Sequence, residues 1–378
     1  MKVKIIHDVQ VSIRSDKENE RTCAYPLTTL AEDGSIVCAY RCGKEKHSYD
    51  GTWLCQRSTD QGRSWSPPVT IFDGRDMTPP RSMVCGGICT AKNGALLSVF
   101  DTVEVTKPDT YFYSDEGKTQ AKCTYIARST DNGATWDCRS GIDLPGFLYG
   151  FTSSPLVLPD GHIFIAGERR RPGQCIRIFA THSDDHGRTL EPFHECIADP
   201  KGELHLCDGR YDVFPDGEMV AYLWALRMED DQTMQSYRAV SSDQGRTWST
   251  AQPVGYLGQI VHPLVLDDNT VLAASNYRWE PHGIYLWLSG DRGLTWPAKS
   301  AVRMWDPDRN QLVADPAKLT EDKIKDLDVN IWKALAMFHF GTPDLTALPD
   351  GTILLTYYAQ PDDHTHVRAC RFKACWKS

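Results

Sequence analysis

The feature that most constrains the fold is a short motif that occurs five times along the chain. Every copy reads Ser-x-Asp-x-Gly-x-Ser/Thr, and the copies begin at Ser58, Ser129, Ser183, Ser241 and Ser289. In such a motif the Ser and Asp oxygens accept hydrogen bonds from nearby backbone N–H groups, and Gly adopts the positive φ angle of a tight turn. We therefore expect the five copies to be structural turns, with no catalytic role for their aspartates.

A second turn motif alternates strictly with the first. It consists of an apolar residue, then Asp-Gly or a close substitute, then an apolar strand, and it occurs six times. Such strict alternation indicates a repeating unit with one strand on each side of each turn, which gives four strands per unit. Six units in 378 residues leave about 63 residues each. The sequence therefore predicts an all-β, six-bladed propeller of four-stranded antiparallel blades, in one domain over residues 1–378. The second motif lies at Asp33-Gly34, Asn93-Gly94, Asp160-Gly161, Asp216-Gly217, Asp268-Asn269 and Asp350-Gly351.

The sixth unit is incomplete at the C-terminal end of the chain. It has no Ser-x-Asp turn, because the chain stops soon after its third strand at Val367–Phe372. We expect a strand within Val3–Ile13 to complete this blade, so that the ring has no open edge. Residues 300–340 exceed an ordinary connection and predict an insertion between units five and six.

Composition and charge narrow the classes of partner. The 41 basic and 50 acidic side chains give a net charge of −9, which argues against binding to nucleic acids or anionic membranes. No apolar run approaches the roughly 18 residues of a membrane-spanning helix, and the first residues are too charged for a signal peptide. We expect a cytoplasmic protein whose thirteen scattered cysteines are buried thiols, in neither disulfides nor a metal site. No motif calls for a metal or cofactor.

Five Ser-x-Asp-x-Gly turns in register with six Asp-Gly turns resemble the Asp boxes of the sialidase (neuraminidase) superfamily, over the whole chain. Both turn types must lie on one rim of a propeller, since each joins two antiparallel strands of the same unit. The resemblance implies a sugar-binding pocket on the opposite rim, with carbohydrate as the partner.

The resemblance also suggests roles for individual residues. Asp50 matches the acid/base of the family's blade-one loop, and Asp208, eight residues before Asp216, stands where the family has the Glu that activates its nucleophile. Departures are equally clear, because Ala24 occupies the position of the first clamp Arg and Thr342 that of the nucleophilic Tyr. The expected catalytic residues are Asp50, Asp101, Asp208 and Asp344, and the expected substrate-binding residues are Arg21, Arg41, Arg227, Arg278, His339 and Trp53.

These observations favour an exo-acting glycoside hydrolase that removes a terminal sugar, with a carboxylated sugar as one candidate, over a strict sialidase. Glycoside cleavage needs a proton donor and a second carboxylate or its equivalent. Two alternatives remain open: a lyase with His205, His262 or His339 as base and an Arg that neutralises a uronate, and a non-catalytic carbohydrate-binding propeller. A convergent carboxylate pair would favour hydrolysis, a His–Tyr–Arg cluster would favour elimination, and a shallow funnel would favour binding alone.

Overall fold

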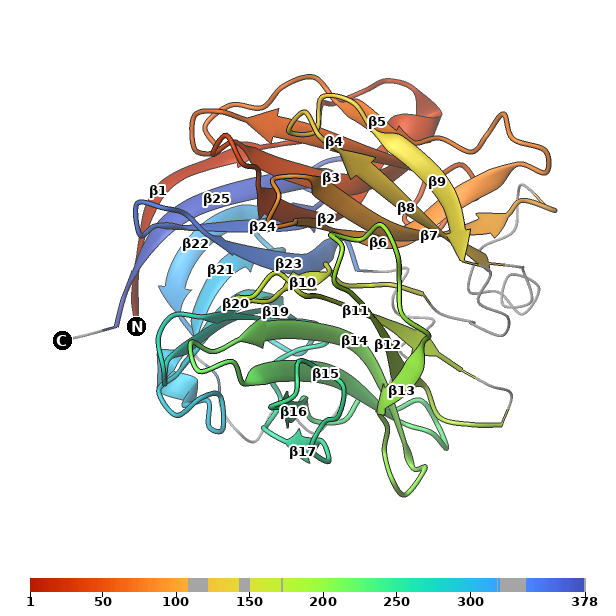
Figure 1. Cartoon of the computed structure of the whole chain (residues 1–378). Helices are drawn as coiled ribbons and strands as arrows, with labels where there is room; N and C mark the ends of the chain where they lie inside the picture. The colour runs from red at the N-terminus through yellow and green to blue at the C-terminus, as the bar shows by residue number, and fades with distance from the viewer. Residues whose placement is uncertain (108–121, 143–149, 171–172, 318, 320–337, 377–378) are drawn as a thin grey trace.

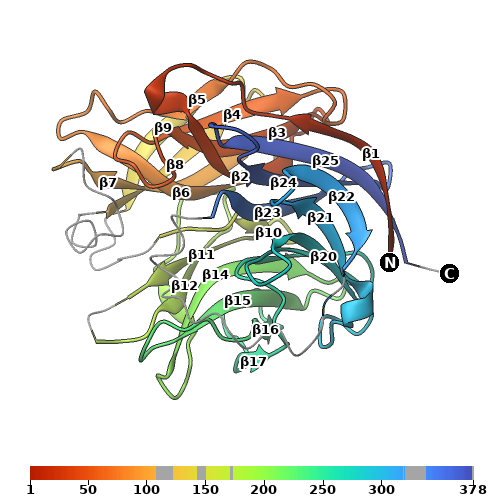
Figure 2. The same ribbon diagram turned by 180° about the vertical axis from the view of Figure 1, so that it is seen from behind.

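The computed structural model describes residues 1–107, 122–142, 150–170, 173–317, 319 and 338–376. The strands among these residues form six antiparallel sheets, arranged around a central axis as six blades (Figure 1, Figure 2). The predicted six-bladed propeller is therefore confirmed. Among the described residues, no helix has the length and apolar character needed to cross a membrane.

Each blade begins with the strand nearest the axis and proceeds outward, apart from blade six, whose outermost strand comes from the N-terminus. Blade one contains β2 (Thr22–Leu30), β3 (Ile36–Gly43), β4 (Thr52–Ser58) and β5 (Val69–Phe72). Blade two contains β6 (Arg81–Thr90), β7 (Leu96–Glu104), β8 (Lys122–Ser129) and β9 (Asp137–Ile142). Blade three contains β10 (Leu156–Val157), β11 (Ile163–Arg169), β12 (Arg177–Ser183) and β13 (His194–Ile197). Blade four contains β14 (Leu204–Val213), β15 (Met219–Arg227), β16 (Tyr237–Ser241) and β17 (Gln252–Pro253). Blade five contains β18 (Val261–Val265), β19 (Val271–Tyr277), β20 (Gly283–Ser289), β21 (Val302–Asp306) and β22 (Gln311–Pro316). Blade six contains β23 (Phe340–Ala347), β24 (Ile353–Ala359), β25 (His366–Cys375) and β1 (Lys2–Gln10).

The ring closes as the sequence predicts. Strand β1 pairs antiparallel with β25, from Lys2 opposite Cys375 to Gln10 opposite Arg368. Both views show the red N-terminal strand beside the blue C-terminal strand, with the chain ends close together (Figure 1, Figure 2). The open edge of blade six is thereby covered.

Blade five differs from the predicted four strands. A fifth strand, β22, pairs with β21 and comes from the segment that the sequence marks as an insertion. The chain can reverse here because Asn310 adopts a φ of 50°, a conformation that Asn tolerates better than most residues. Residues 320–337 of the same insertion lie outside the described part of the chain.

The five Ser-x-Asp turns are held by the same hydrogen bonds. In the first, Ser58 Oγ accepts from the N–H of Gly62 at 2.7 Å, and Asp60 accepts from the N–H and hydroxyl of Ser64 at 2.9 and 2.6 Å. The other four turns repeat these bonds. Hydrogen bonding, from Ser64 above all, lowers the pKa of Asp60 to about 2.

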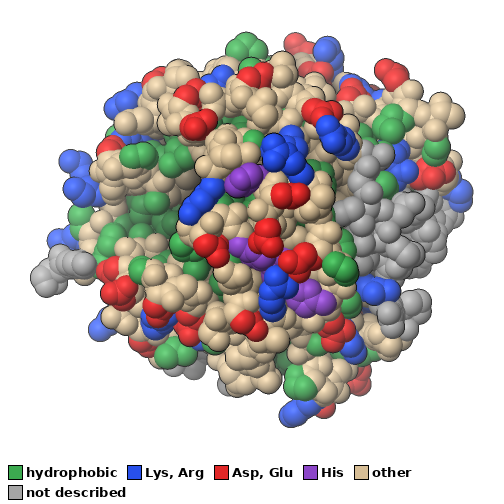
Figure 3. Space-filling view, viewed as in Figure 1, with side chains coloured by type: hydrophobic (Ala, Val, Ile, Leu, Met, Phe, Trp, Pro, Cys, Tyr) green, Lys and Arg blue, Asp and Glu red, His purple; other side chains and the backbone are tan. Residues whose placement is uncertain are grey.

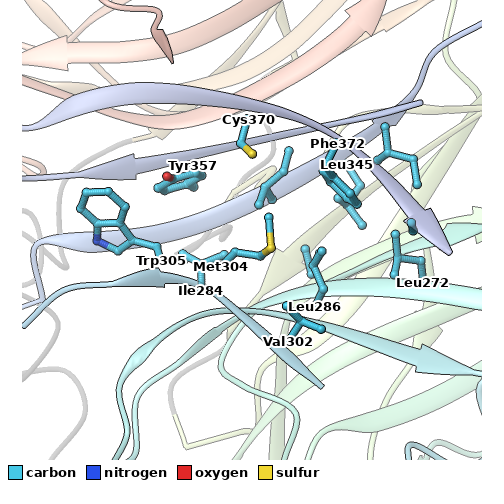
Figure 4. Close-up of a cluster of buried hydrophobic side chains, with 14 of the residues drawn as sticks. Leu272, Ile284, Leu286, Val302, Met304, Trp305, Leu345, Tyr357, Cys370 and Phe372 are labelled. Carbon is cyan, nitrogen blue, oxygen red and sulfur yellow. The ribbon is translucent and has the colours of Figure 1, made fainter. Parts of the chain in front are cut away.

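Apolar side chains fill the space between adjacent blades. Strands β19 and β24 are buried along their whole length, because each blade is covered on both faces by its neighbours. Figure 4 shows one such cluster, in which Leu272 and Trp305 of blade five meet Tyr357 and Phe372 of blade six. All thirteen cysteines are free thiols, and all except Cys375 are at least partly buried.

Candidate functional site

Four of the six innermost strands carry a β-bulge near the rim opposite the turns. The register shifts lie at Ala24/Leu27 in β2, Met83/Cys85 in β6, Cys207/Arg210 in β14 and Gly341/Asp344 in β23. A bulge locally re-aims side chains, and the first residues inserted at the four bulges all line one pocket. They are Tyr25, Val84, Asp208 and Thr342, of which Tyr25, Asp208 and Thr342 adopt φ angles of 60°, 51° and 46°.

The pocket lies on the propeller axis and draws on every blade. It holds about 950 Å³, counted out to the open solvent at its mouth. The lining of the pocket follows a simple sequence rule. In all six blades, the residue eight positions before the first residue of the Asp-Gly-type turn lines the pocket. In blades three to six the residue eight positions after the turn faces it as well. The first set is Tyr25, Cys85, Thr152, Asp208, Ile260 and Thr342, and the second is Glu168, Trp224, Asn276 and Tyr358.

Two carboxylates from neighbouring blades meet on one side of the pocket. Glu168, at the end of β11, is 4% exposed and accepts hydrogen bonds from the Thr152 hydroxyl at 3.2 Å and from the N–H of Asp208. Burial, and then the negative charge of Asp208, raise the pKa of Glu168 to about 8. Burial also raises the pKa of Asp208, while the Arg210 guanidinium opposes that shift. The pair therefore retains a proton near neutral pH.

Two cations flank this carboxylate pair. Arg210 donates from Nη1 to the Gly209 carbonyl at 3.1 Å and to the Thr152 hydroxyl at 3.4 Å. Lys122 also lines the pocket, and burial lowers its pKa. Behind it, Asp101 is 2% exposed and accepts hydrogen bonds from Thr124 Oγ1 and the Phe151 N–H, each at 2.5 Å. Asp101 thus lies behind the pocket wall, and burial raises its pKa.

The other side of the pocket combines aromatic and basic groups. A hydrogen bond of 2.9 Å joins the Tyr25 hydroxyl to Nε2 of His47. Arg278 donates from Nη1 to the Phe340 carbonyl at 2.6 Å. The Lys46 ammonium lies 5.7 Å from the ring centre of Tyr358. Burial lowers the pKa of Lys46 to about 7 and that of His47 well below its usual value, so His47 is neutral.

Of the predicted catalytic residues, only Asp208 lines this pocket. Asp344 lies deeper along the axis, where its Oδ2 accepts from the Thr28 N–H at 2.9 Å and its Oδ1 lies 3.1 Å from Nδ1 of His262. Asp50 lies outside the lining and accepts hydrogen bonds from the Lys44 N–H and the Ser48 hydroxyl of its own loop.

The predicted substrate-binding residues lie in different parts of the molecule. Arg278 lines the pocket. Arg41 is fully buried and donates to the carbonyls of Met83, Glu45 and Ser48, while Trp53 is fully buried and donates to Ser98 at 2.9 Å. Arg227 forms an ion pair of 2.7 Å with Asp230. Arg21 and His339 line a second groove beside the pocket.

The sequence-based prediction did not name the pocket residues Glu168, Tyr358, Lys46, His47, Arg210 and Lys122 as site residues. The spacing of eight residues after the Asp-Gly turn could have found Glu168 and Tyr358. No comparable signal marks Lys46 and His47, which come from the loop between β3 and β4.

Two surface observations concern other ligands. On the face shown in Figure 3, acidic and basic side chains are interspersed, so no single sign of charge dominates that face. In the described part of the chain, one group of potential metal ligands lies together: Asp362, Asp363 and His364. Both ring nitrogens of His364 already have hydrogen-bond partners, and Arg14 pairs with both aspartates.

No protein-family model and no curated protein matches this chain. Solved structures with the same fold include a protein of unknown function from Dyadobacter fermentans DSM 18053, at 20% identity over 99% of both chains with a TM-score of 0.72. The Hadza microbial sialidase Hz136 matches at 15% identity and a TM-score of 0.67, over 93% of this chain and 66% of that one. The intramolecular trans-sialidase from Ruminococcus gnavus matches at 13% identity and a TM-score of 0.64, over 94% and 95%. The chain therefore has the six-bladed propeller fold found in sialidases.

Proposed function

We propose that this protein is a glycoside hydrolase that removes a terminal sugar, with Glu168 as the general acid. The observation that carries the proposal is the convergence of Glu168 and Asp208 in one pocket, where the pair retains a proton near neutral pH. A general acid must hold a proton at the working pH and transfer it to the leaving oxygen. The shared fold with proteins named as sialidases supports the same class of reaction.

Asp208 is the second carboxylate in this proposal. Arg210 favours its charged form, while burial and Asp208 together favour the protonated form of Glu168. Environments that separate the roles of two carboxylates are typical of glycosidases. We assign the acid role to Glu168 and not to Asp50, because the Asp50 carboxylate is hydrogen-bonded within its own loop.

The charges of the pocket support an anionic sugar as substrate. Four basic side chains line it, against the two carboxylates of the acid pair. Because burial lowers the pKa of Lys46 to about 7 and also lowers that of Lys122, the positive charge of the pocket comes mainly from Arg210 and Arg278. Guanidinium donors of this kind favour a sugar that carries a carboxylate or a similar group. The basic residues are Lys46, Lys122, Arg210 and Arg278.

The experiment is a screen of aryl and alkyl sialosides, uronides and arabinosides for released sugar. Glu168→Gln should lower kcat by about 10²–10⁴ on substrates with poor leaving groups and much less on activated aryl glycosides. The wild-type rate on poor leaving groups should fall as pH rises through about 8, because Glu168 then loses its proton. Asp50→Asn is the matched comparison, and a loss that depends on the leaving group in that variant alone would move the acid to Asp50.

A second candidate function is elimination from a uronate-containing glycan. The Tyr25–His47 hydrogen bond favours it, since a neutral His beside a phenol can abstract a proton while Arg278 or Lys46 neutralises the carboxylate. Elimination leaves a carbon–carbon double bond that absorbs ultraviolet light, whereas hydrolysis does not. Loss of that absorbance in His47→Ala, with Glu168→Gln still active, would establish the lyase. Sugar binding without either product would support a binding propeller.

A further inference from the structure

The five Ser-x-Asp turns differ at the residue that directly follows the motif. Four copies are followed by Trp, whereas the copy in blade three is followed by Leu190. Each of the four indoles packs against an apolar cluster between its own blade and the preceding one. Leu190 packs against the equivalent cluster between blades two and three, with a smaller side chain. The four tryptophans are Trp65, Trp136, Trp248 and Trp296.

A groove lies beside Leu190, between the outer strands of blades two and three. This lateral groove holds about 1810 Å³, counted out to the open solvent. Among the described residues it shares none with the central pocket, and parts of two Ser-x-Asp turns line it, so it lies near the rim opposite the pocket. In the next blade the ring of Trp248 fills the corresponding place, 5.9 Å from the ring centre of Phe164. The apolar side chains of the lateral groove are Ile126, Leu190, Pro192 and Phe193.

The two acidic side chains in the described lining of the lateral groove are already paired. Asp137 lies 3.0 Å from the guanidinium of Arg139, which also lines the groove. Glu191 forms an ion pair of 2.8 Å with Arg246, which is not part of the described lining. These carboxylates therefore leave the other cations of the groove without a counter-charge.

Arg128 and Arg188 are those cations. The Arg128 guanidinium donates to the carbonyl of His186, a neutral acceptor. The Arg188 guanidinium makes no hydrogen bond or ion pair with any residue that the structure describes. Burial, and then the charge of Arg188, lower the pKa of Arg128, which indicates that the two guanidinium groups repel each other. A carboxylate between them would relieve this repulsion and accept hydrogen bonds from both.

We propose that the lateral groove is a docking site for a segment of a partner protein in which an aromatic side chain lies between acidic residues. The aromatic ring occupies the space that an indole occupies at the other blade interfaces, and the acidic side chains pair with Arg128 and Arg188. A second copy of this chain does not fit, because no Phe, Tyr or Trp is exposed in the part of the chain that the structure describes.

The binding test uses fluorescence anisotropy with a labelled peptide that has one Trp between two pairs of glutamates. Leu190→Trp should weaken binding at least about tenfold, because the new indole takes the place of the peptide's ring. Arg188→Gln should weaken it about two- to tenfold, since one charged donor is lost. The matched controls, Leu294→Trp and Arg63→Gln, should bind as the wild type does. Leu294 is 58% exposed on blade five, and Arg63 has in blade one the same position in its turn as Arg188.

Two further peptides test the chemistry of the partner. One has Ala in place of Trp and the other has Lys in place of every Glu, and each should bind at least about tenfold more weakly. Equal binding of either peptide would overturn an acidic, aromatic partner. Unchanged binding in Leu190→Trp, or no binding of the acidic Trp peptide at about 1 mM, would also overturn the proposal. No measurement here requires turnover, so failure of the catalytic proposal leaves these results unaffected.

A stability measurement tests whether the lateral groove has room for an indole. Leu190→Trp should raise the thermal midpoint by about 1–3 °C, because the new ring makes the contact that the other four tryptophans make. The midpoint of Leu294→Trp should not rise. A lower midpoint in Leu190→Trp would show that the ring does not fit, and would overturn the proposed docking site.

Discussion

Single buried ionisable residues determine how this protein responds to pH. Glu168 and His182 are both almost fully buried, and burial disfavours the charged form of each. For the carboxylic acid this raises the pKa to about 8, and for the imidazole it lowers the pKa to about 4. The first shift creates a proton donor in the pocket, whereas the second has a consequence for stability.

His182 should make the protein less stable in mild acid. Besides burial, the charge of Arg246 and the neighbouring His162 and His194 lower its pKa, with Glu191 opposing them. Between pH 6.5 and about 4 the unfolded chain binds a proton at this position that the folded chain does not bind. The free energy of unfolding should therefore fall over this range by about 1–3 kcal/mol from this residue alone.

The variant His182→Gln tests this expectation by urea unfolding at a series of pH values. Its slope of unfolding free energy against pH should be shallower than that of the wild type between pH 6.5 and 4. The two slopes should agree between pH 7 and 8, where the imidazole is neutral in both states. Parallel curves over the whole range would show that His182 does not cause the acid sensitivity.

At the scale of secondary structure elements, the Ser-x-Asp turns connect the outer strands of five blades. Each Asp satisfies donors within its own turn, so its contribution is local and should be similar in every blade. Bulges act in the opposite way, because they break the regular pairing of β2, β6, β14 and β23 so that selected side chains face the pocket. Turns thus build the blades, and bulges shape the site.

Asp60→Ala should lower the free energy of unfolding by about 1–3 kcal/mol, since it removes acceptors from Ser58, Ser64 and the backbone of the turn. Chemical denaturation provides the measurement. Asp137→Ala is the control, because Asp137 is an exposed aspartate paired with Arg139, and its loss should change stability by less than about 0.5 kcal/mol. Similar effects of the two substitutions would contradict a special role for the turn.

At the scale of the whole molecule, stability depends on closure of the ring. Strand β1 supplies the fourth strand of blade six, and Val11 continues the pairing by donating its N–H to the Val367 carbonyl at 2.8 Å. Val3 and Ile5 pack against the apolar cluster between blades five and six. The N-terminal segment therefore joins the last blade by both hydrogen bonds and apolar contacts.

Deletion of residues 1–13 should lower the thermal midpoint markedly and broaden the transition, because it exposes the edge of β25 and part of an apolar cluster. Differential scanning calorimetry measures both effects. A synthetic peptide with the deleted sequence should restore part of the midpoint when added in excess. An unchanged midpoint in the truncated protein would contradict the role of this closure.

The architecture follows from the amino-acid sequence alone, because the motifs that specify it are local. Each turn motif forms its hydrogen bonds within about five residues, so the six Asp-Gly-type turns specify six blades. The last blade has no Ser-x-Asp turn, and this absence specifies that its outer strand comes from the N-terminus. The positions of the same turns also predict which residues line the pocket, since Asp208 lies eight residues before the turn at Asp216 and lines it. The sequence did not indicate that the insertion would add β22 to blade five.

Which polar residues come into contact depends on how the blades pack against each other. Glu168 and Asp208 are forty residues apart and come together because two blades pack side by side, with a bulge turning Asp208 toward Glu168. In a strand, a displacement of one residue moves a side chain to the opposite face, so no pattern of alternation could reveal this contact. Asp50 and Arg41 show the opposite case, since the sequence predicts both in the site and the structure places neither in the pocket lining. Both side chains form hydrogen bonds with backbone groups of the loop between β3 and β4.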